Sequence, residues 1–129
     1  MELKAYFENN RGFGVLATAD QQGNVDAAVY SRPHVMADGT LAFIMNDRLS
    51  HQYLQSNPHA AYLFREGSEG YQGKRFFLTK IREEQDSELL DQLKRRVYPK
   101  DKPHEGPRFL VFFKIDKELP LIGPGEETD

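Results

Sequence analysis

Apolar residues along this chain recur at every second position, or form short continuous runs, in six segments. Both patterns are typical of β-strands, either half-buried or buried on both faces. The connections between neighbouring segments are short, and glycine and asparagine at 20–24 and Asp38-Gly39 provide hairpin turns, which allow antiparallel but not parallel pairing. The six predicted strands are Gly14–Ala19, Val25–Ser31, Leu41–Met45, Ala60–Phe64, Lys74–Arg82 and Arg108–Ile115.

Helical spacing of apolar residues is clearest within Glu83–Val97, where three leucines and a valine share one face. Asp86 or Ser87 is the expected N-cap of this helix. A shorter helix is expected at Glu2–Asn9, packed over one end of a barrel. A proline-bounded loop, Tyr98–Pro107, is expected before the last strand.

Two of the predicted strands, Lys74–Arg82 and Arg108–Ile115, carry apolar residues on both faces. A strand of this kind is buried on both sides. One side is expected to face the interior of a barrel. For Lys74–Arg82 the other side is covered either by a second subunit or by the helix within Glu83–Val97, and the sequence leaves both alternatives open.

Composition limits the class of protein. The chain has 129 residues, which predicts a single domain over residues 1–129, and its 39% hydrophobic and 29% charged residues are typical of a soluble globular protein. It has no cysteine, no apolar run long enough to span a membrane and no signal-peptide pattern at its start, so we expect a cytoplasmic protein. A net charge of −3 gives no general attraction to nucleic acid.

The most informative segment lies between the strands Leu41–Met45 and Ala60–Phe64. A short helix is expected there, capped by Asn46, Asp47 or Ser50, and it ends at Asn57-Pro58 because proline disfavours helical geometry in the residue before it. The start of a helix offers unpaired N–H groups and the positive end of a dipole, which suit a phosphate. The polar side chains at this start are therefore candidate anion ligands, and the alternative is an ordinary capped surface helix. These candidates are Arg48, Ser50, His51 and Gln52.

A second candidate lies at the end of the strand Val25–Ser31. Arg32 follows this strand, and its planar guanidinium can donate two hydrogen bonds to a phosphate. The alternative is an arginine at an exposed strand end.

Other chemistry has less support. The four histidines are far apart and show no metal-ligand spacing, and no metal site is predicted. The chain also lacks the serine-hydrolase elbow, the phosphate-binding loop of P-loop nucleotide proteins and the glycine fingerprint of dinucleotide-binding folds.

The order of elements around the short helix resembles a known family. A strand, the pattern N-x-x-x-S (Asn46 to Ser50), the pattern L-x-x-N-P (Leu54 to Pro58) and a second strand are similar to the flavin-binding split-barrel family typified by pyridoxamine 5'-phosphate oxidase. The resemblance extends from about Gly12 to about Ile115. It implies a mainly β, six-stranded antiparallel split β-barrel with two or three flanking helices, in a homodimer whose cofactor cleft lies between the two protomers.

The resemblance also implies FMN as the cofactor and an FMN-binding protein, with a flavin-dependent oxidoreductase of unassigned substrate as the first hypothesis. A non-enzymatic flavin carrier, and a relative that binds the deazaflavin F420 or haem, are the alternatives. No catalytic residue is assigned. The cofactor-binding residues it implies follow the first hairpin or begin the short helix, and they are Tyr30, Ser31, Arg32, Met45, Asn46, Arg48, Ser50, His51 and Gln52.

Overall fold

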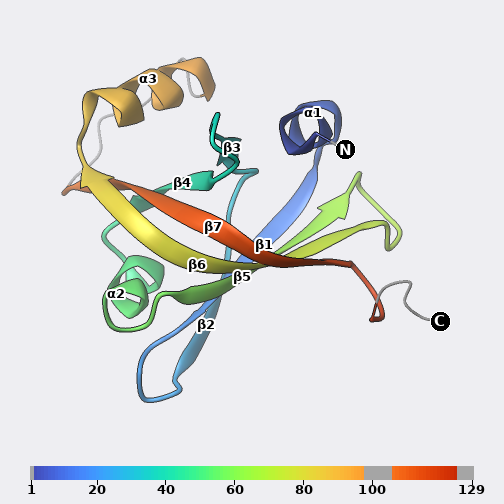
Figure 1. Ribbon diagram of the computed structural model, residues 1–129, viewed down its shortest axis with the longest axis horizontal. Coiled ribbons are helices and arrows are strands. Elements are labelled where there is room, and N and C mark those ends of the chain that lie inside the picture. Colours follow the sequence, from blue (N-terminus) through green and yellow to red (C-terminus); the bar gives the residue numbers. More distant parts are fainter. Residues whose placement is uncertain (1, 98–105, 125–129) are drawn as a thin grey trace.

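All seven strands in the described part of the chain belong to one antiparallel sheet (Figure 1). The computed structural model describes residues 2–97 and 106–124, so most of the predicted loop Tyr98–Pro107 lies outside the described residues. The elements are α1 (Leu3–Asn9), β1 (Gly12–Ala19), β2 (Val25–Val29), β3 (His34–Val35), β4 (Leu41–Asn46), α2 (Leu49–Ser56), β5 (His59–Glu66), β6 (Gly73–Gln85), α3 (Glu88–Val97) and β7 (Arg108–Pro120).

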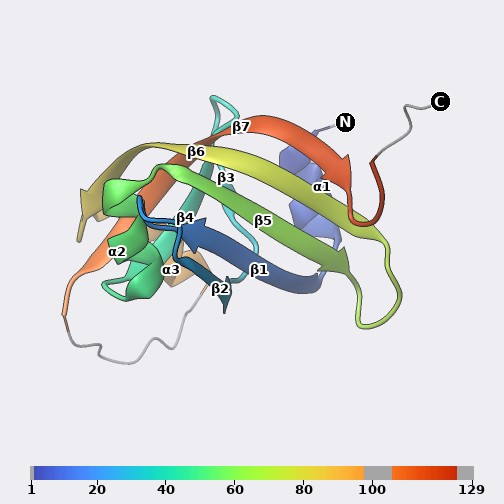
Figure 2. The same ribbon diagram turned by 90° about the horizontal axis from the view of Figure 1, so that it is seen from below.

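The strand order, β2-β1-β5-β6-β7-β4-β3, differs from the expected six-stranded split barrel in that the sheet has seven strands and does not close. The additional strand is β3, which has two residues and pairs with β4. It is separate from β2 because Pro33 has no N–H to donate, so the chain leaves the sheet after β2. The sheet ends at β2 and β3, which do not pair with each other, and it is therefore strongly curved but not closed (Figure 2). The antiparallel pairing and the three helices agree with the sequence analysis.

The concave side of the sheet holds the main core. Alternate residues of each long strand point inward, and α1 closes one end through Tyr6 and Phe7, as expected for that helix. Eight of the inward side chains are completely buried aromatic or aliphatic groups, so this interior leaves little room for a ligand. They are Leu16, Leu41, Tyr62, Phe64, Phe76, Leu78, Val111 and Phe113.

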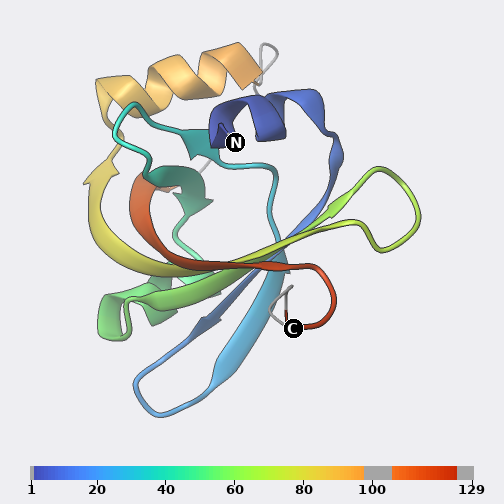
Figure 3. The same ribbon diagram turned by 45° about the vertical axis from the view of Figure 1, so that its right-hand side comes forward.

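A second core lies between α3 and the outer face of β4 and β7. Leu90 and Leu93 of α3 pack there against Leu110 and Phe112 of β7, on the side of the molecule where α1 also lies (Figure 3). Ser87 caps α3, since its Oγ accepts a hydrogen bond from the N–H of Leu90 at 3.1 Å. The second face of β7 is thus covered by the chain's own helix.

One contact inside the barrel fixes the end of β2. The Tyr62 side chain is fully buried, and its hydroxyl lies 3.1 Å from the carbonyl oxygens of both Tyr30 and Ser31. Gly14 of β1 leaves the space that this hydroxyl fills: a Cβ at position 14 would lie 2.0 Å from Tyr62 Oη and 2.6 Å from the Tyr30 carbonyl oxygen. The glycine is required here by close approach and not by backbone conformation.

No helix in the described ranges of the chain is both long enough and apolar enough to cross a membrane.

We expect Gly14→Ala to destabilise the protein by on the order of 3 kcal/mol, because the added methyl group must displace Tyr62 or the end of β2. Thermal unfolding measures this effect. Thr18→Val is the matched control on the same buried face of β1: Thr18 Oγ1 is buried without a hydrogen-bond partner among the described residues, so its replacement costs little or stabilises. Equal stability of Gly14→Ala and the wild type would mean that Tyr62 does not occupy this space.

Candidate functional site

A pocket of about 430 Å³ lies where the sheet fails to close. β3 pairs with β4 only at Leu41 and Ala42, so within the described residues the rest of that edge of β4 faces the end of β2 and the start of α2. The volume falls in the range of roughly 300–1,000 Å³ that is usual for cofactor sites. The lining residues are Asp26, Ala28, Val29, Tyr30, Ser31, Arg32, His34, Ala42, Phe43, Ile44, Asn46, Arg48, Leu49 and Ser50.

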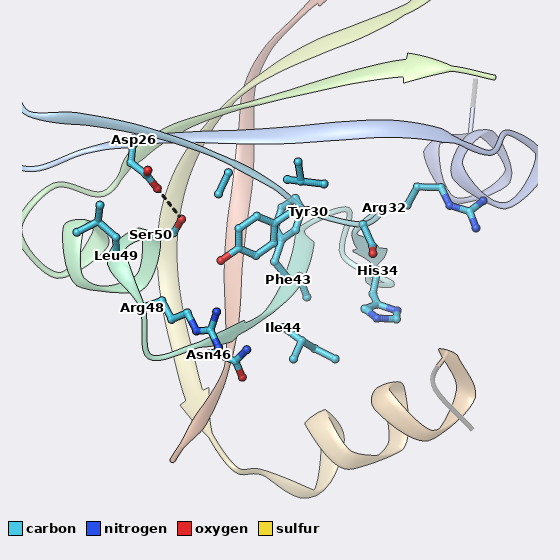
Figure 4. A pocket seen from close by; sticks show the side chains of 14 residues that line it. Asp26, Tyr30, Arg32, His34, Phe43, Ile44, Asn46, Arg48, Leu49 and Ser50 are labelled. Atoms are coloured by element: carbon cyan, nitrogen blue, oxygen red, sulfur yellow. Dashed lines mark hydrogen bonds between the residues drawn. The ribbon is translucent and has the colours of Figure 1, made fainter. Parts of the chain in front are cut away.

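The alternation of β2 directs its side chains to the pocket. Asp26, Ala28 and Tyr30 are half-buried and alternate with the exposed Val25, Ala27 and Val29, as a strand with one covered face requires. Phe43, in edge contact with the Tyr30 ring at 5.9 Å between centroids, and Ile44 form an apolar wall across from β2 (Figure 4).

The start of α2 borders the same pocket. Arg48 is the N-cap residue and makes no side-chain capping hydrogen bond, which corrects the expectation that Asn46, Asp47 or Ser50 caps this helix. The physical reason lies in competing partners: the Asp47 carboxylate is 3.0 Å from His51 Nδ1, and Ser50 is already inside the first turn. The first N–H groups of α2 therefore lie beside the cationic Arg48 with no side chain capping them.

Ser50 has a buried hydroxyl that bonds to an acidic residue. Its side chain is 4% exposed, and its Oγ donates to Asp26 Oδ2 at 3.3 Å (Figure 4). Burial raises the pKa of the nearby Tyr30 phenol, and the negative charge of Asp26 raises it further. A hydrogen bond with Ser50 and the positive charge of Arg48 lower this pKa and offset part of the rise. The Tyr30 phenol is therefore protonated at neutral pH and can donate a hydrogen bond.

Arg32 lines the pocket, but its guanidinium points away from it. Nη1 donates to the carbonyl oxygens of Phe7, at 2.5 Å, and Asn10, at 3.0 Å, at the end of α1 (Figure 4). These carbonyls lie at the negative end of the α1 dipole, which accounts for the attraction. Arg32 thus fastens α1 to the segment that follows β2, and its role as a phosphate ligand stays a prediction.

His51 lies behind the pocket, on the buried side of α2. Its ring is stacked on Phe109 of β7 at 3.7 Å, with Asp47 Oδ1 3.0 Å from Nδ1 and Glu83 Oε2 3.0 Å from Nε2. Lys80 forms an ion pair with Glu83 at 2.9 Å. Partial burial opposes ionisation of Glu83, but hydrogen bonds from Lys80, His51 and Gln55 outweigh it, and the pKa of Glu83 is lowered.

Six of the nine predicted cofactor ligands line the pocket: Tyr30, Ser31, Arg32, Asn46, Arg48 and Ser50. Three do not. Met45 is 1% exposed in the barrel core, His51 is buried against β6 and β7, and Gln52 is exposed on α2. Among the residues that the sequence reasoning missed, Asp26 had a usable signal, because it shares the strand face of Tyr30 at a spacing of four residues.

Comparison with solved structures identifies the fold. An FMN-binding protein from Syntrophomonas wolfei subsp. wolfei is 21% identical, with a TM-score of 0.74, over 94% of this chain and 84% of that one. An F420 reductase is 15% identical, with a TM-score of 0.67, over 92% and 97% of the two chains. HutZ, a haem storage protein from Vibrio cholerae, is 16% identical, with a TM-score of 0.68, over 90% of each chain.

These similarities show that the chain has the split-barrel fold of pyridoxamine 5'-phosphate oxidase-like proteins, and they confirm the resemblance at the level of the fold. A protein of that kind from Listeria innocua, described only as a putative oxidase, is 17% identical, with a TM-score of 0.67, over 93% and 98% of the two chains. No family model and no curated protein matches the sequence. Within residues 2–97 and 106–124, no three histidine or acidic side chains are grouped as a metal site requires.

The lowered pKa of Glu83 predicts a pH-dependent contribution to stability. Since the folded-state pKa lies below the ordinary value of about 4.3, this contribution is complete above that value and is lost as the pH falls through the lowered pKa. We expect the melting temperature of Glu83→Gln to lie below that of the wild type at neutral pH, and the two to converge in acid. A difference in thermal unfolding that is independent of pH would mean that the Glu83 charge does not stabilise the fold.

Proposed function

We propose that this protein binds FMN in the pocket between β2, β4 and α2, with the phosphate held by Arg48 and the first N–H groups of α2. The observation that carries the proposal is the pairing of a cationic, side-chain-uncapped helix start with an apolar wall in one pocket of suitable volume. A phosphate requires the first feature and a flat heteroaromatic ring requires the second. An FMN-binding protein with the same fold supports the proposal.

The residues present fit such a cofactor in chemical type. Ile44 and Ala28 offer apolar surface to a ring, while Asn46 and the protonated Tyr30 phenol offer hydrogen bonds at its edge. Arg48 is exposed, so its side chain has room to approach a phosphate. These properties match the parts of FMN without requiring a change in the barrel core.

We propose in addition that the protein is an oxidoreductase. FMN when bound supplies the electron or hydride transfer, and the protein supplies orientation, charge and exclusion of water. On this chain, Arg48 would balance the phosphate charge, and the pocket walls would hold the ring at the opening of the sheet. The substrate is not assigned, and no residue is assigned as acid or base.

We propose further that the protein forms a homodimer, which associates through the convex face of β2, β1, β5 and β6. Two adjacent rows of paired residues on that face are largely apolar: Val29, Val15 and Leu63 in one, and Ala27, Ala17, Ala61 and Phe77 in the other. Val29 is 68% exposed and Leu63 38% exposed, which is unusual for strands that pair so regularly. Val29 and the half-exposed Leu49 also line the pocket, so this face reaches the cofactor site and a second copy would cover its rim.

We expect Arg48→Ala to weaken FMN binding by on the order of tenfold to a hundredfold, because a charge-assisted contact is worth roughly 1.5–3 kcal/mol. Riboflavin, which lacks the phosphate, should lose little. Flavin fluorescence titration measures both affinities.

The matched control is Arg32→Ala, which removes the same group from the other side of the pocket. Because its guanidinium bonds to α1, this variant is expected to melt at a lower temperature while keeping the wild-type ratio of FMN to riboflavin affinity. A selective loss of FMN in Arg32→Ala and not in Arg48→Ala would move the phosphate to Arg32. A purified protein that releases haem or F420 instead of FMN would contradict the choice of cofactor.

We expect the wild type to sediment as a dimer at micromolar concentration and Ala17→Glu to sediment as a monomer, since the charge would lie in the middle of the apolar face. Tyr71→Glu is the control, because Tyr71 is 77% exposed in the loop between β5 and β6. A wild-type monomer, or a dimer that tolerates Ala17→Glu, would contradict association through this face.

A further inference from the structure

We propose that Asp26 recognises hydroxyl groups of the ligand and thereby selects cofactors that carry a polyol chain. This inference rests on the proposed flavin-binding function and adds a specificity-determining residue to it. Asp26 is half-buried on the inward face of β2, lines the pocket and accepts a hydrogen bond from the buried Ser50 hydroxyl (Figure 4).

The first argument counts hydrogen-bond donors. A serine hydroxyl has a single hydrogen, and the Ser50 hydrogen is directed to Asp26 Oδ2. The Ser50 hydroxyl also has a hydrogen bond with the Tyr30 phenol. The acceptors that the pair presents to the pocket are therefore chiefly the remaining lone pairs of the Asp26 carboxylate. A phosphate dianion also has only acceptors, whereas a hydroxyl group can donate to them.

The second argument concerns charge. A carboxylate close to a phosphate repels it, so Asp26 does not suit the anionic end of the ligand. Arg48, on the N-terminal side of Ser50, supplies the positive charge in the same pocket. Both charges also act on the Tyr30 phenol, Asp26 raising its pKa and Arg48 lowering it, so the pocket contains an acidic and a basic group near one tyrosine.

The third argument is geometric. The Ser50 to Asp26 distance of 3.3 Å exceeds the 2.7–2.8 Å usual between two oxygens, so this hydrogen bond is weak and Asp26 can accept a stronger one from a ligand. In FMN the ribityl chain adjoins the phosphate and carries hydroxyl groups. A ligand whose phosphate is near Arg48 thus has hydroxyl groups available for Asp26, while haem has none.

Three flavins separate the possible contacts: FMN, riboflavin, which has the ribityl chain without phosphate, and lumiflavin, which has the ring alone. In fluorescence titrations of Asp26→Ala we expect riboflavin affinity to fall on the order of tenfold and lumiflavin affinity to stay unchanged. FMN should lose less than riboflavin, because removing the negative charge also favours its phosphate. Asp26→Asn, which keeps one acceptor oxygen, should lose less riboflavin affinity than Asp26→Ala.

The control is Asp91→Asn, which removes the same charge from the first turn of α3, outside the pocket, and should leave all three affinities unchanged. Thermal unfolding of each variant establishes that it is folded. An equal loss of affinity for lumiflavin and riboflavin would overturn the inference, because Asp26 would then face the ring. A gain in FMN affinity with riboflavin affinity unchanged would also overturn it, because Asp26 would then face only the phosphate. A wild type that binds none of the three flavins would refute the proposed function itself, and the role of Asp26 with it.

Discussion

The Tyr62 hydroxyl holds the open side of this barrel in place. Tyr62 is fully buried, and its hydroxyl lies between the carbonyl oxygens of Tyr30 and Ser31, in a space that Gly14 leaves free. Those two carbonyls belong to the segment where β2 has ended and β3 has not begun, and the N–H of Tyr30 still bonds to the Gly14 carbonyl oxygen of β1 at 3.0 Å. The Tyr62 phenol thus offers its one hydrogen to this pair of carbonyls at the place where the chain leaves the sheet and forms a pocket wall.

The opposite wall depends on a polar network beneath α2. His51 lies between the carboxylates of Asp47 and Glu83, stacked on Phe109, and the two amide hydrogens of Gln55 are directed to the His51 carbonyl and to Glu83. The network joins the first turn of α2 to β6 and β7, and in this way it fixes where the helix start faces the pocket. His51, Asp47 and Glu83 thus hold the start of α2 in place, although none of the three lines the pocket.

The sequence predicted the larger strands well because the alternation of apolar and polar residues follows from which face of each strand is buried. It predicted the end of α2 because Pro58 acts locally, and the cap of α3 because Ser87 bonds to its own helix. It placed the hairpin turn at Asp38-Gly39, but it did not count β3 as a strand, because two residues are too few to show a period. Closure of the sheet was also beyond reach, since it depends on the accumulated curvature of strands distant in sequence.

The site was predictable to the extent that it follows the chain locally. The short helix before Pro58 and the strand that begins at Val25 could be placed because each has a sequence signal of its own, although Arg48 and not the expected residues caps the helix and β2 ends two residues before Ser31. The direction of the Arg32 guanidinium could not be predicted, because it is decided by the carbonyls of Phe7 and Asn10, more than twenty residues away. His51 failed as a pocket residue for a similar reason: Glu83 and Phe109, both distant in sequence, draw its ring to the other side of α2.

The fold alone does not select a cofactor, since solved structures with it include an FMN-binding protein, an F420 reductase and a haem storage protein. Selection must come from the donors and acceptors that a particular chain places at the opening of the sheet. In this chain the opening has a cation at a helix start, a protonated phenol, and a carboxylate paired with a buried hydroxyl. The polar groups of haem are two anionic propionates, and Asp26 would oppose one of them wherever Arg48 attracted the other. A ligand with one anionic end and a neutral hydroxylated chain satisfies both residues at once, which is the combination that FMN provides.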